Sequence, residues 1–386
     1  MTKYKVNNVY PESSSSANES IDVKNQDLRF LINSHTGLGN FILKTPMVMA
    51  ILKFYPNAII DVIGGGVDRA ELALEGADFI DNIYSFDRRW SLYRKFWFYL
   101  KLRKLSYDAV FVPFDDETRF MFFGALFCGA KKVYSHVFLK SKVSAFLKML
   151  ISVFSSKLTL VPLLPSRHEI DLNYDLLQSF IGRPFTRDYK TYCSFGESSD
   201  ILDTFGLVKG EYIVIQPGAR SGMPTPKRWS LNNFKELIAL CHEKYPSFTI
   251  VTIGNQYDFD NYVSKIVESY TQVINTAGLT SISEAASILR NAAVSVVHDS
   301  GAMHIGGAVK AKMIALYGPT DYTRTKPLGE ENTVLFSMKK SFAEMYDFSC
   351  GEDLLIEKYG QDYCMDGITP NDVMNAIKKY VSQKAC

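Results

Sequence analysis

The sequence predicts an α/β protein made of two Rossmann-like, doubly wound parallel-sheet domains with a cleft between them. Three observations lead to this fold. Short apolar runs typical of buried strands alternate with amphipathic segments typical of helices. This alternation is visible up to the apolar run at 108–114 and starts again near residue 211. The length of 386 residues is sufficient for two domains, each with its own core.

In the first half, four apolar runs are predicted to be strands: "LRFLIN" at 28–33, "AIIDVI" at 58–63, "FIDNIY" at 79–84 and "DAVFVPF" at 108–114. After the first strand and the loop "SHTGLGN", apolar residues recur at helical spacing, so a helix is expected to start near Asn40 or Thr45. Two more helices are expected around 68–75 and 90–105.

In the second half, strands are predicted at 211–218 (a strand and its turn), 248–254, 293–298 and 312–318. Helices are predicted at 230–245, 257–269, 281–292, 302–309 and 369–383. Ser281 and Glu284 have the spacing of a capping box, while Thr369 and Pro370 suit the N-cap and first position of the last helix.

The domain boundaries follow from composition. Residues 1–26 are polar and lack an apolar core, so we expect a disordered tail and not a signal peptide. Residues 27–185 are assigned to the first domain and residues 196–368 to the second, with the proline-containing stretch 182–195 as linker. Residues 369–386 are expected to hold a C-terminal helix.

Composition excludes several classes of protein. A net charge of +2 does not predict a nucleic-acid-binding protein, and no apolar run is long enough for a spanning helix. The six cysteines, at positions 128, 193, 241, 350, 364 and 386, have no zinc-ligand spacing and are expected to be reduced structural thiols. We therefore expect a cytoplasmic protein.

Two loops beyond predicted strands have the features of an anion site. Asp299, Ser300 and Gly301 precede a predicted helix, whose free N–H groups suit a phosphate, and His304 lies one turn further on. Simple N-capping by Asp299 or Ser300, and a buried core role for His304, are the alternatives. Gly306 and Gly307 are expected to allow close packing of that helix on the sheet.

The second loop, "PGARSGMPTPKRWS" at 217–230, carries Arg220, Lys227 and Arg228 ahead of a helix start. Cations at this position favour a pyrophosphate, although a solvated basic loop is the alternative. Because the carboxyl ends of parallel strands meet at one edge of the sheet, we expect both loops to converge on one ligand.

Other motifs are excluded. "HTGLGN" at 35–40 lacks the third glycine of a dinucleotide-binding fingerprint, and the chain has no P-loop. "FDDE" at 114–117 is not a D-x-D metal motif, but Asp115 and Asp116 follow a strand and could act as a base or bind a sugar hydroxyl. A solvated turn is the alternative.

The segment 88–104 combines seven basic residues with six aromatic residues and has no acidic residue. Such a helix could lie on an anionic membrane surface or bind a phosphorylated glycolipid, and an ordinary helix with a charged outer face is the alternative. A second basic and apolar stretch at 140–157 favours an amphiphilic partner.

Together these motifs resemble glycosyltransferase family 9, the heptosyltransferase-like enzymes of lipopolysaccharide assembly. The resemblance runs in order over roughly residues 28 to 380, through "GLGNFILKTPMVMAI", "YDAVFVPFDDETR", "IQPGARS…PKRWS", "AGLTSISEAASIL", "HDSGAMHIGGAV", "ALYGPTDYTRTKPLG" and "CMDGITPNDV". It implies a GT-B fold, with the acceptor on the first domain, a nucleotide-sugar on the second, and a last helix that crosses back to the first domain.

The resemblance also implies inverting, metal-independent transfer from a nucleoside-diphosphate sugar, often ADP-heptose, with no further cofactor. The implied donor-binding residues are Arg220, Lys227, Asp299, Ser300, Gly301, His304 and Thr320. The implied acceptor-binding residues are Gly37, Gly39, Arg88, Arg89, Arg94 and Arg119. The acceptor would be a phosphorylated glycolipid or other glycan at the inner membrane surface, where the protein would be peripheral.

One departure from the family concerns the base. The family commonly has an aspartate where this chain has Asn40, and an asparagine side chain cannot usefully accept a proton near neutral pH. Asp115, Asp116 or His35 could replace it, the reaction could rely on leaving-group stabilisation, or the substrates could differ. A catalytically idle protein of the same fold, which binds sugar nucleotides or serves in assembly, is the second hypothesis. An epimerase or phosphorylase fits the order of the motifs less well.

Overall fold

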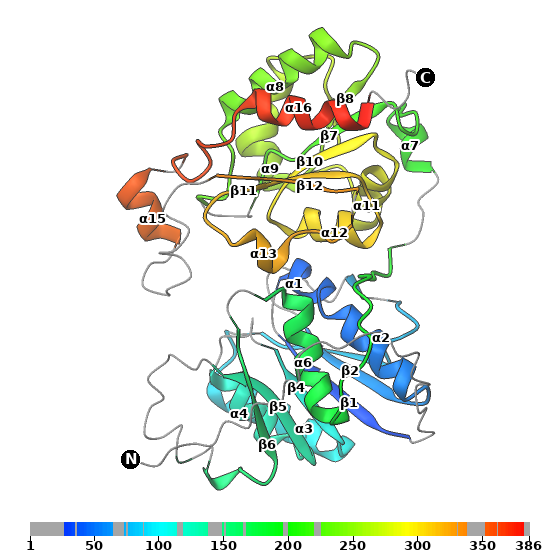
Figure 1. The fold of residues 1–386 in the computed structure, drawn as a ribbon, viewed down its shortest axis with the longest axis vertical. Coiled ribbons are helices and arrows are strands. Elements are labelled where there is room, and N and C mark those ends of the chain that lie inside the picture. The colour runs from blue at the N-terminus through cyan, green and yellow to red at the C-terminus, as the bar shows by residue number, and fades with distance from the viewer. Residues whose placement is uncertain are drawn as a thin grey trace.

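In the computed structural model the described residues are 27–34, 37–64, 73–74, 76–87, 89–113, 119–137, 149, 152–164, 167–195, 200–219, 225–329, 331–337, 352–360 and 362–381. They form two α/β units, one above the other in Figure 1, each built on a parallel sheet of six strands. The predicted tail, residues 1–26, lies outside the described residues.

The first sheet has the order β3-β2-β1-β4-β5-β6. Its strands are β1 (Arg29–Asn33), β2 (Ile59–Gly64), β3 (Asn82–Ser85), β4 (Ala109–Val112), β5 (Lys132–Val137) and β6 (Leu158–Pro162). The second sheet has the order β12-β11-β10-β7-β8-β9, which is the same topology read from the other edge. Its strands are β7 (Tyr212–Ile215), β8 (Thr249–Thr252), β9 (Ile274–Asn275), β10 (Val294–His298), β11 (Met313–Tyr317) and β12 (Thr333–Phe336).

Helices cover both faces of each sheet. Those of the N-terminal unit are α1 (Leu38–Ile42), α2 (Thr45–Phe54), α3 (Leu92–Leu102), α4 (Arg119–Phe127) and α6 (Glu169–Ile181). Those of the C-terminal unit are α7 (Asp200–Thr204), α8 (Leu231–Lys244), α9 (Gln256–Asp258), α10 (Ser264–Val267), α11 (Ile282–Asn291), α12 (Gly301–Ala308), α13 (Tyr322–Thr325), α15 (Glu352–Tyr359) and α16 (Pro370–Val381).

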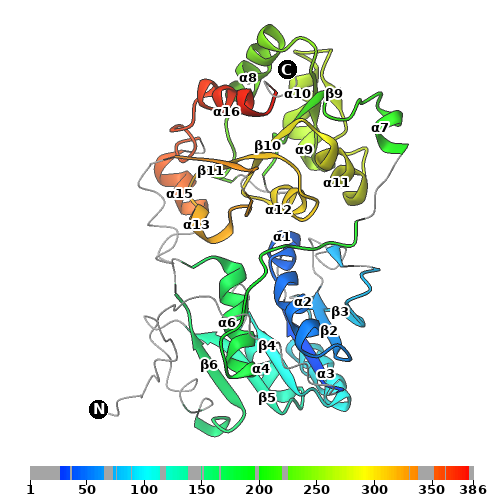
Figure 2. The same cartoon turned by 45° about the vertical axis from the view of Figure 1, so that its right-hand side comes forward.

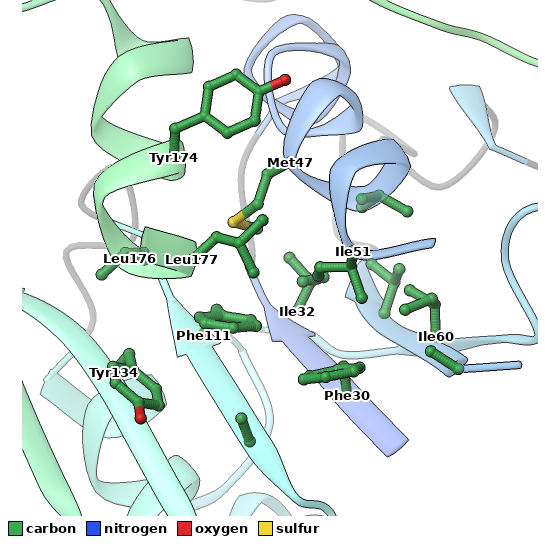
Figure 3. Close-up of a cluster of buried hydrophobic side chains, with 14 of the residues drawn as sticks. Phe30, Ile32, Met47, Ile51, Ile60, Phe111, Tyr134, Tyr174, Leu176 and Leu177 are labelled. Carbon is green, nitrogen blue, oxygen red and sulfur yellow. The ribbon is translucent and has the colours of Figure 1, made fainter. Parts of the chain in front are cut away.

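Successive side chains of a strand point to opposite faces of the sheet, and this explains the two layers of helices around the first sheet. Phe30 and Ile32 of β1 point toward α2 and α6, where Figure 3 shows them near Met47, Ile51 and Leu177. Leu31, between them in sequence, belongs to a separate core under α3 and α4. A strand buried on both faces reads as a continuous apolar run, which is why "LRFLIN" predicted a central parallel strand.

Most predicted elements are confirmed with small shifts of their ends. The predicted helix after the first strand is two helices, α1 and α2, separated by Leu43 and Lys44. The predicted strand at 79–84 is confined to Asn82–Ser85, and the predicted helix at 257–269 contains a π-helical segment at Phe259–Val263. The capping box of Ser281 and Glu284 is confirmed.

The prediction that the last helix crosses back to the first domain is wrong for the described residues. Helix α16 packs its apolar face onto α8 and the second sheet, and Val373, Met374 and Ile377 are buried in the same core as Trp229 and Phe234. Figure 1 shows α16 beside α8, at the far end from the N-terminal unit. The amphipathic pattern of residues 369–383 predicted the helix but could not identify the surface that it covers.

None of the helices in the described part of the chain is both long and apolar enough to cross a bilayer. Four cysteines lie in that part, at positions 128, 193, 241 and 364, and none of them forms a disulfide there.

Candidate functional site

Each sheet changes direction of winding between its two central strands, β1 and β4 in the first and β7 and β10 in the second. In open α/β sheets this is where ligands bind, beyond the carboxyl ends of the strands. Helix α1 follows β1 and helix α12 follows β10, and Figures 1 and 2 both show these helices where the two units meet. Residues beyond β7 and β10 therefore face residues beyond β1.

The centre of the site is a buried carboxylate held by a cation. Lys227 donates from Nζ to Oδ2 of Asp299 at 3.1 Å, and the Thr325 hydroxyl donates to the other oxygen at 3.2 Å. Burial opposes ionisation of Asp299, but Lys227, His304 and Thr320 outweigh it and hold the pKa of this carboxyl below its usual value. Asp299 is therefore an anion that positions Lys227, and it is poorly suited to act as a base.

Ser300 occupies the N-cap position of α12, but its hydroxyl does not cap the helix. It exchanges hydrogen bonds with the side chain of Gln216, at 3.0 and 3.1 Å. Gln216 follows β7, so this pair fastens the loop after β10 to the loop after β7. The N–H groups at the start of α12 are therefore not engaged by the Ser300 side chain, as the anion hypothesis requires.

His298 has a structural role next to the site. Its Nε2 accepts from the backbone N–H of Trp229 at 3.0 Å, so Nδ1 carries the proton and donates to the carbonyl of Gly218 at 2.9 Å. Complete burial lowers its pKa to about 4, and the ring is neutral at physiological pH. This residue fixes both ends of the 217–230 loop relative to β10.

Arg228 is a buried cation in the same loop. Its side chain is 3% exposed, and its three guanidinium nitrogens have no hydrogen-bond partner among the described residues. The guanidinium lies over the ring of Tyr262, with Cζ 3.9 Å from the ring centroid. A buried polar group without a protein partner calls for water or a ligand, and a guanidinium suits the oxygens of a phosphate or a nucleotide.

His304 is at the contact between the two units. A Cβ built on Gly39 would lie 2.2 Å from Cδ2 of His304, so only glycine allows α1 and α12 to approach this closely. Burial lowers the pKa of His304 to about 4. It is therefore neutral at physiological pH and cannot supply a permanent positive charge to a ligand.

Asn40 lies half-buried in α1, and its backbone carbonyl accepts from Nζ of Lys44 at 2.9 Å. Lys44 is only 3% exposed, and its charge reaches His304, where it helps to lower the pKa of that histidine. The N-terminal unit thus places a buried cation beside the position where the family resemblance leads one to expect an acid.

A second contact between the units joins the start of α6 to α13. His168 donates from Nε2 to the carbonyl of Lys326 at 3.1 Å, while Nδ1 accepts from the backbone of Ile170. Arg324 and Glu169 form an ion pair at 3.3 Å. These contacts join the two units between α6 and α13.

The structure brings together Lys227, Asp299, Ser300, Gly301, His304, Gly39 and Asn40, with Gly37 at the N-cap of α1. Thr320 is also buried there. Gly318, two residues earlier, packs against Met365, where a Cβ would lie 2.3 Å from Sδ. Arg89 and Arg94 lie elsewhere, by α3, where Arg89 pairs with Asp87 and Arg94 lies over Trp90. The predicted residues His35, Arg88, Asp115, Asp116 and Arg220 and the side chain of Arg119 lie outside the described residues.

Four residues of the site were not selected from the sequence: Gln216, His298, Thr325 and Lys44. Gln216 and His298 each stand at the end of a central strand, so the rule used for Asp299 would also have found them. Lys44 carries the clearest signal, because a lysine in the apolar stretch "FILKTPMVM" is buried with its helix and must have a polar environment.

Comparisons with known proteins identify the family of the chain. A family model described as glycosyltransferase family 9 (heptosyltransferase) matches residues 128–350. Lipooligosaccharide heptosyltransferase 2 of Campylobacter jejuni subsp. jejuni serotype O:6 is 27% identical over 176 residues, which are 45% of this chain and 52% of that protein. The chain spans at most about half the length of the curated relatives that it matches.

Two solved structures have the same fold over nearly the whole chain. A glycosyltransferase family 9 protein of Veillonella parvula DSM 2008 matches with a TM-score of 0.73 and 18% identity, covering 94% of this chain and 99% of that one. The ADP-heptose lipopolysaccharide heptosyltransferase II of E. coli matches with a TM-score of 0.67 and 20% identity, covering 94% and 100%. At these identities the likeness shows the fold, which is GT-B with two Rossmann-like domains, as predicted.

Proposed function

The chain belongs to glycosyltransferase family 9, and on that premise we propose that it transfers a heptose from ADP-heptose to a phosphorylated glycolipid of lipopolysaccharide or a related surface glycan. The E. coli structure with the same fold is named as an enzyme for ADP-heptose, and the curated relatives are lipopolysaccharide or lipooligosaccharide heptosyltransferases. The acceptor would be met at the cytoplasmic side of the inner membrane.

One observation carries the donor assignment. Lys227 and Arg228 are adjacent, both belong to the loop after β7, and Arg228 is a buried guanidinium without a hydrogen-bond partner among the described residues. Lys227, which Asp299 holds just before the start of α12, and the neighbouring Arg228 suit the two charges of a diphosphate. Asp299 holds the Lys227 ammonium in place before the donor arrives, which lowers the ordering cost of binding.

We propose a single inverting displacement. The acceptor hydroxyl oxygen forms a bond to the anomeric carbon while the bond from that carbon to the diphosphate oxygen breaks on the opposite face, and the hydroxyl proton passes to a base or to water. Negative charge grows on the departing diphosphate, so fixed cations there stabilise the transition state more than the ground state. Lys227 and Arg228 would serve this role without a metal ion, and activity should persist in a chelator.

Asn40 is proposed to bind the acceptor hydroxyl and not to remove its proton. Nζ of Lys44 already donates to the Asn40 backbone carbonyl, so an aspartate at position 40 would lie close to a buried lysine. That lysine would stabilise the ionised aspartate and make it a weak base. The proposed site is therefore a working variant and not a decayed one.

The direct test is thermal unfolding of the purified protein with ADP, UDP, GDP or CMP at equal concentrations, without metal. A ligand that binds only the native state raises the unfolding temperature, so ADP should give the largest shift. Arg228→Met should reduce that shift, whereas Lys209→Met, a change at an exposed lysine away from the site, should not. A larger shift with another nucleotide would replace the donor, and no shift with any would contradict donor binding and favour a non-catalytic role in assembly.

Asn40→Asp separates a working site from a decayed one. We expect this variant to transfer heptose at the wild-type rate or more slowly, measured as ADP release with the acceptor present. A large gain in kcat would contradict the role given to Lys44 and indicate a site that has lost its base.

A further inference from the structure

Positive charge is concentrated in two parts of the N-terminal domain. Residues 88–107 contain seven lysines and arginines, residues 118–168 contain eight, and neither stretch contains an aspartate or glutamate. The rest of the chain has 28 basic residues against all 41 acidic ones. A net charge of +2 therefore hides a strongly basic region attached to an acidic remainder.

The structure joins these two stretches through a chain of aromatic rings. On α3, Tyr93 contacts Trp97 and Trp97 contacts Phe96, with ring centroids 6.0 and 6.5 Å apart. Phe96 contacts Phe127 of α4 at 6.4 Å, and Phe127 contacts Phe154 at 5.8 Å. Segments that are separate in sequence thus form one continuous apolar surface.

This surface is exposed among the described residues. Its apolar side chains, with exposed fractions from 40% to 72%, are Leu92, Tyr93, Phe96, Trp97, Phe127 and Val153. Exposed cations from the same segments border it: Arg94, Lys101, Lys104 and Lys157. We refer to these ten residues as the aromatic–basic surface. Single exposed apolar residues are ordinary, but a contiguous group with a basic border marks an interaction site.

We propose that the aromatic–basic surface docks the protein onto an anionic lipid bilayer. Tryptophan and tyrosine favour the interfacial layer of a membrane, where an apolar ring and a polar group are both accommodated. Lysines and arginines beside them are attracted to anionic headgroups. The absence of any carboxylate from both stretches removes the repulsion that such a surface would otherwise meet.

The surface is distinct from the donor site. Tyr99 and Leu102 of α3 are buried in the core under α3 and α4, opposite the face that α2 and α6 cover, and Figures 1 and 2 both show α3 in the half of the N-terminal domain farther from the C-terminal domain. Docking would hold the N-terminal domain at the membrane and leave the nucleotide-binding domain free to meet its donor. The inference extends the proposed function, in which the acceptor is lipid-linked, but depends on other residues.

The test is co-sedimentation of the full chain with vesicles of equal parts phosphatidylglycerol and phosphatidylcholine, and with vesicles of phosphatidylcholine alone. We expect binding to the mixed vesicles only, weakened by salt. Trp97→Ser combined with Tyr93→Ser should weaken it about tenfold, and Lys101→Glu combined with Lys104→Glu by at least as much. Matched changes on the C-terminal domain, Val208→Ser with Leu279→Ser and Lys209→Glu with Lys244→Glu, should leave it unchanged.

The stabilisation by ADP should be the same in all four double variants, which separates this inference from the donor assignment. Equal binding to both kinds of vesicle, binding to neither, or equal losses in the matched variants would each overturn docking. So would self-association that Trp97→Ser abolishes without any vesicle binding, because the surface would then join two copies of the chain.

Discussion

The two domains have the same strand order, but a buried ion pair lies at a different end of the sheet in each. In the C-terminal domain, Asp299 and Lys227 lie beyond the carboxyl ends of β10 and β7. In the N-terminal domain, Asp61 of β2 is completely buried and paired with Arg29 at 2.7 Å. Tyr107, just before β4, also donates to Asp61, at 2.8 Å.

The difference indicates two roles for a buried ion pair. Arg29 and Tyr107 stand at the amino ends of β1 and β4, so the Asp61 cluster ties three strands together at the end of the sheet where ligands do not bind. The Asp299 pair lies where they do, and it includes a lysine that remains partly exposed. Position along the strand, and not burial alone, separates a structural pair from a functional one.

The largest expected effect tests the structural pair. Asp61→Ala leaves the Arg29 guanidinium, the Tyr107 hydroxyl and the Asn82 amide without a buried acceptor, and should lower the free energy of unfolding by about 3–5 kcal/mol. The measurement is urea unfolding. Lys131→Ala, which removes a 73% exposed partner of Asp108, is the control and should cost less than about 1 kcal/mol. Equal losses would remove the structural role from Asp61.

The next effect tests the functional pair. Lys227→Ala should reduce kcat/KM for ADP-heptose by about 10²–10³, the range for removing one fixed donor that stabilises growing charge. Its loss of stability should be smaller than that of Asp61→Ala, because Thr325 still donates to Asp299. Steady-state transfer assays and urea unfolding of both variants check the contrast. If Lys227→Ala destabilised the protein as much as Asp61→Ala and left transfer unchanged, the functional role of the Lys227–Asp299 pair would be contradicted.

A third effect concerns the contact between the domains. Gly39→Ala places a methyl group against His304, and relieving such overpacking typically costs about 1–3 kcal/mol. The strain can be released by moving α1 away from α12. We therefore expect the main effect to be a lower kcat, with a smaller effect on the free energy of unfolding. Gly307→Ala is the matched control in α12, since its Cβ would make only ordinary contact with Pro327 at 4.0 Å and should be neutral or stabilising. Identical kcat values for the two variants would contradict the interdomain role.

Sequence patterns predicted the central strands and the donor loops because both have local signatures. Apolar runs without alternation indicate buried parallel strands, and polar residues after β10 are visible as a break in such a run. What they could not predict depends on partners distant in sequence. The surface covered by α16, the pairing of Ser300 with Gln216 and the need for glycine at position 39 are decided by residues more than 80 positions away or in another domain.

Strands β5 and β6 were missed for a related reason. Strands β5 and β6 carry polar residues such as Lys132, Ser135 and Thr159, so they lack the uninterrupted apolar pattern of β1 and β10. Their position at the side of the sheet permits this, since one flank of β6 has no neighbouring strand in the described order. A pattern rule that finds central strands therefore underestimates the width of the sheet.

The smallest effect sharpens the comparison through pH. His298 and His304 are buried in the C-terminal domain, and burial lowers the pKa of each from 6.5 to about 4. Below pH 6.5 the two histidines bind protons in the unfolded chain but not in the native protein. The stability that these buried rings contribute is therefore complete above pH 6.5 and is lost as the pH falls toward 4. Each ring should add up to about 1.4 kcal/mol per pH unit to the slope of the unfolding free energy. His304→Gln should reduce the slope of the unfolding free energy against pH by the contribution of one histidine. The measurement is urea unfolding at pH 7, 6 and 5. An unchanged slope would mean that His304 is accessible to protons in the native state, and the contact between α1 and α12 would then be open in solution.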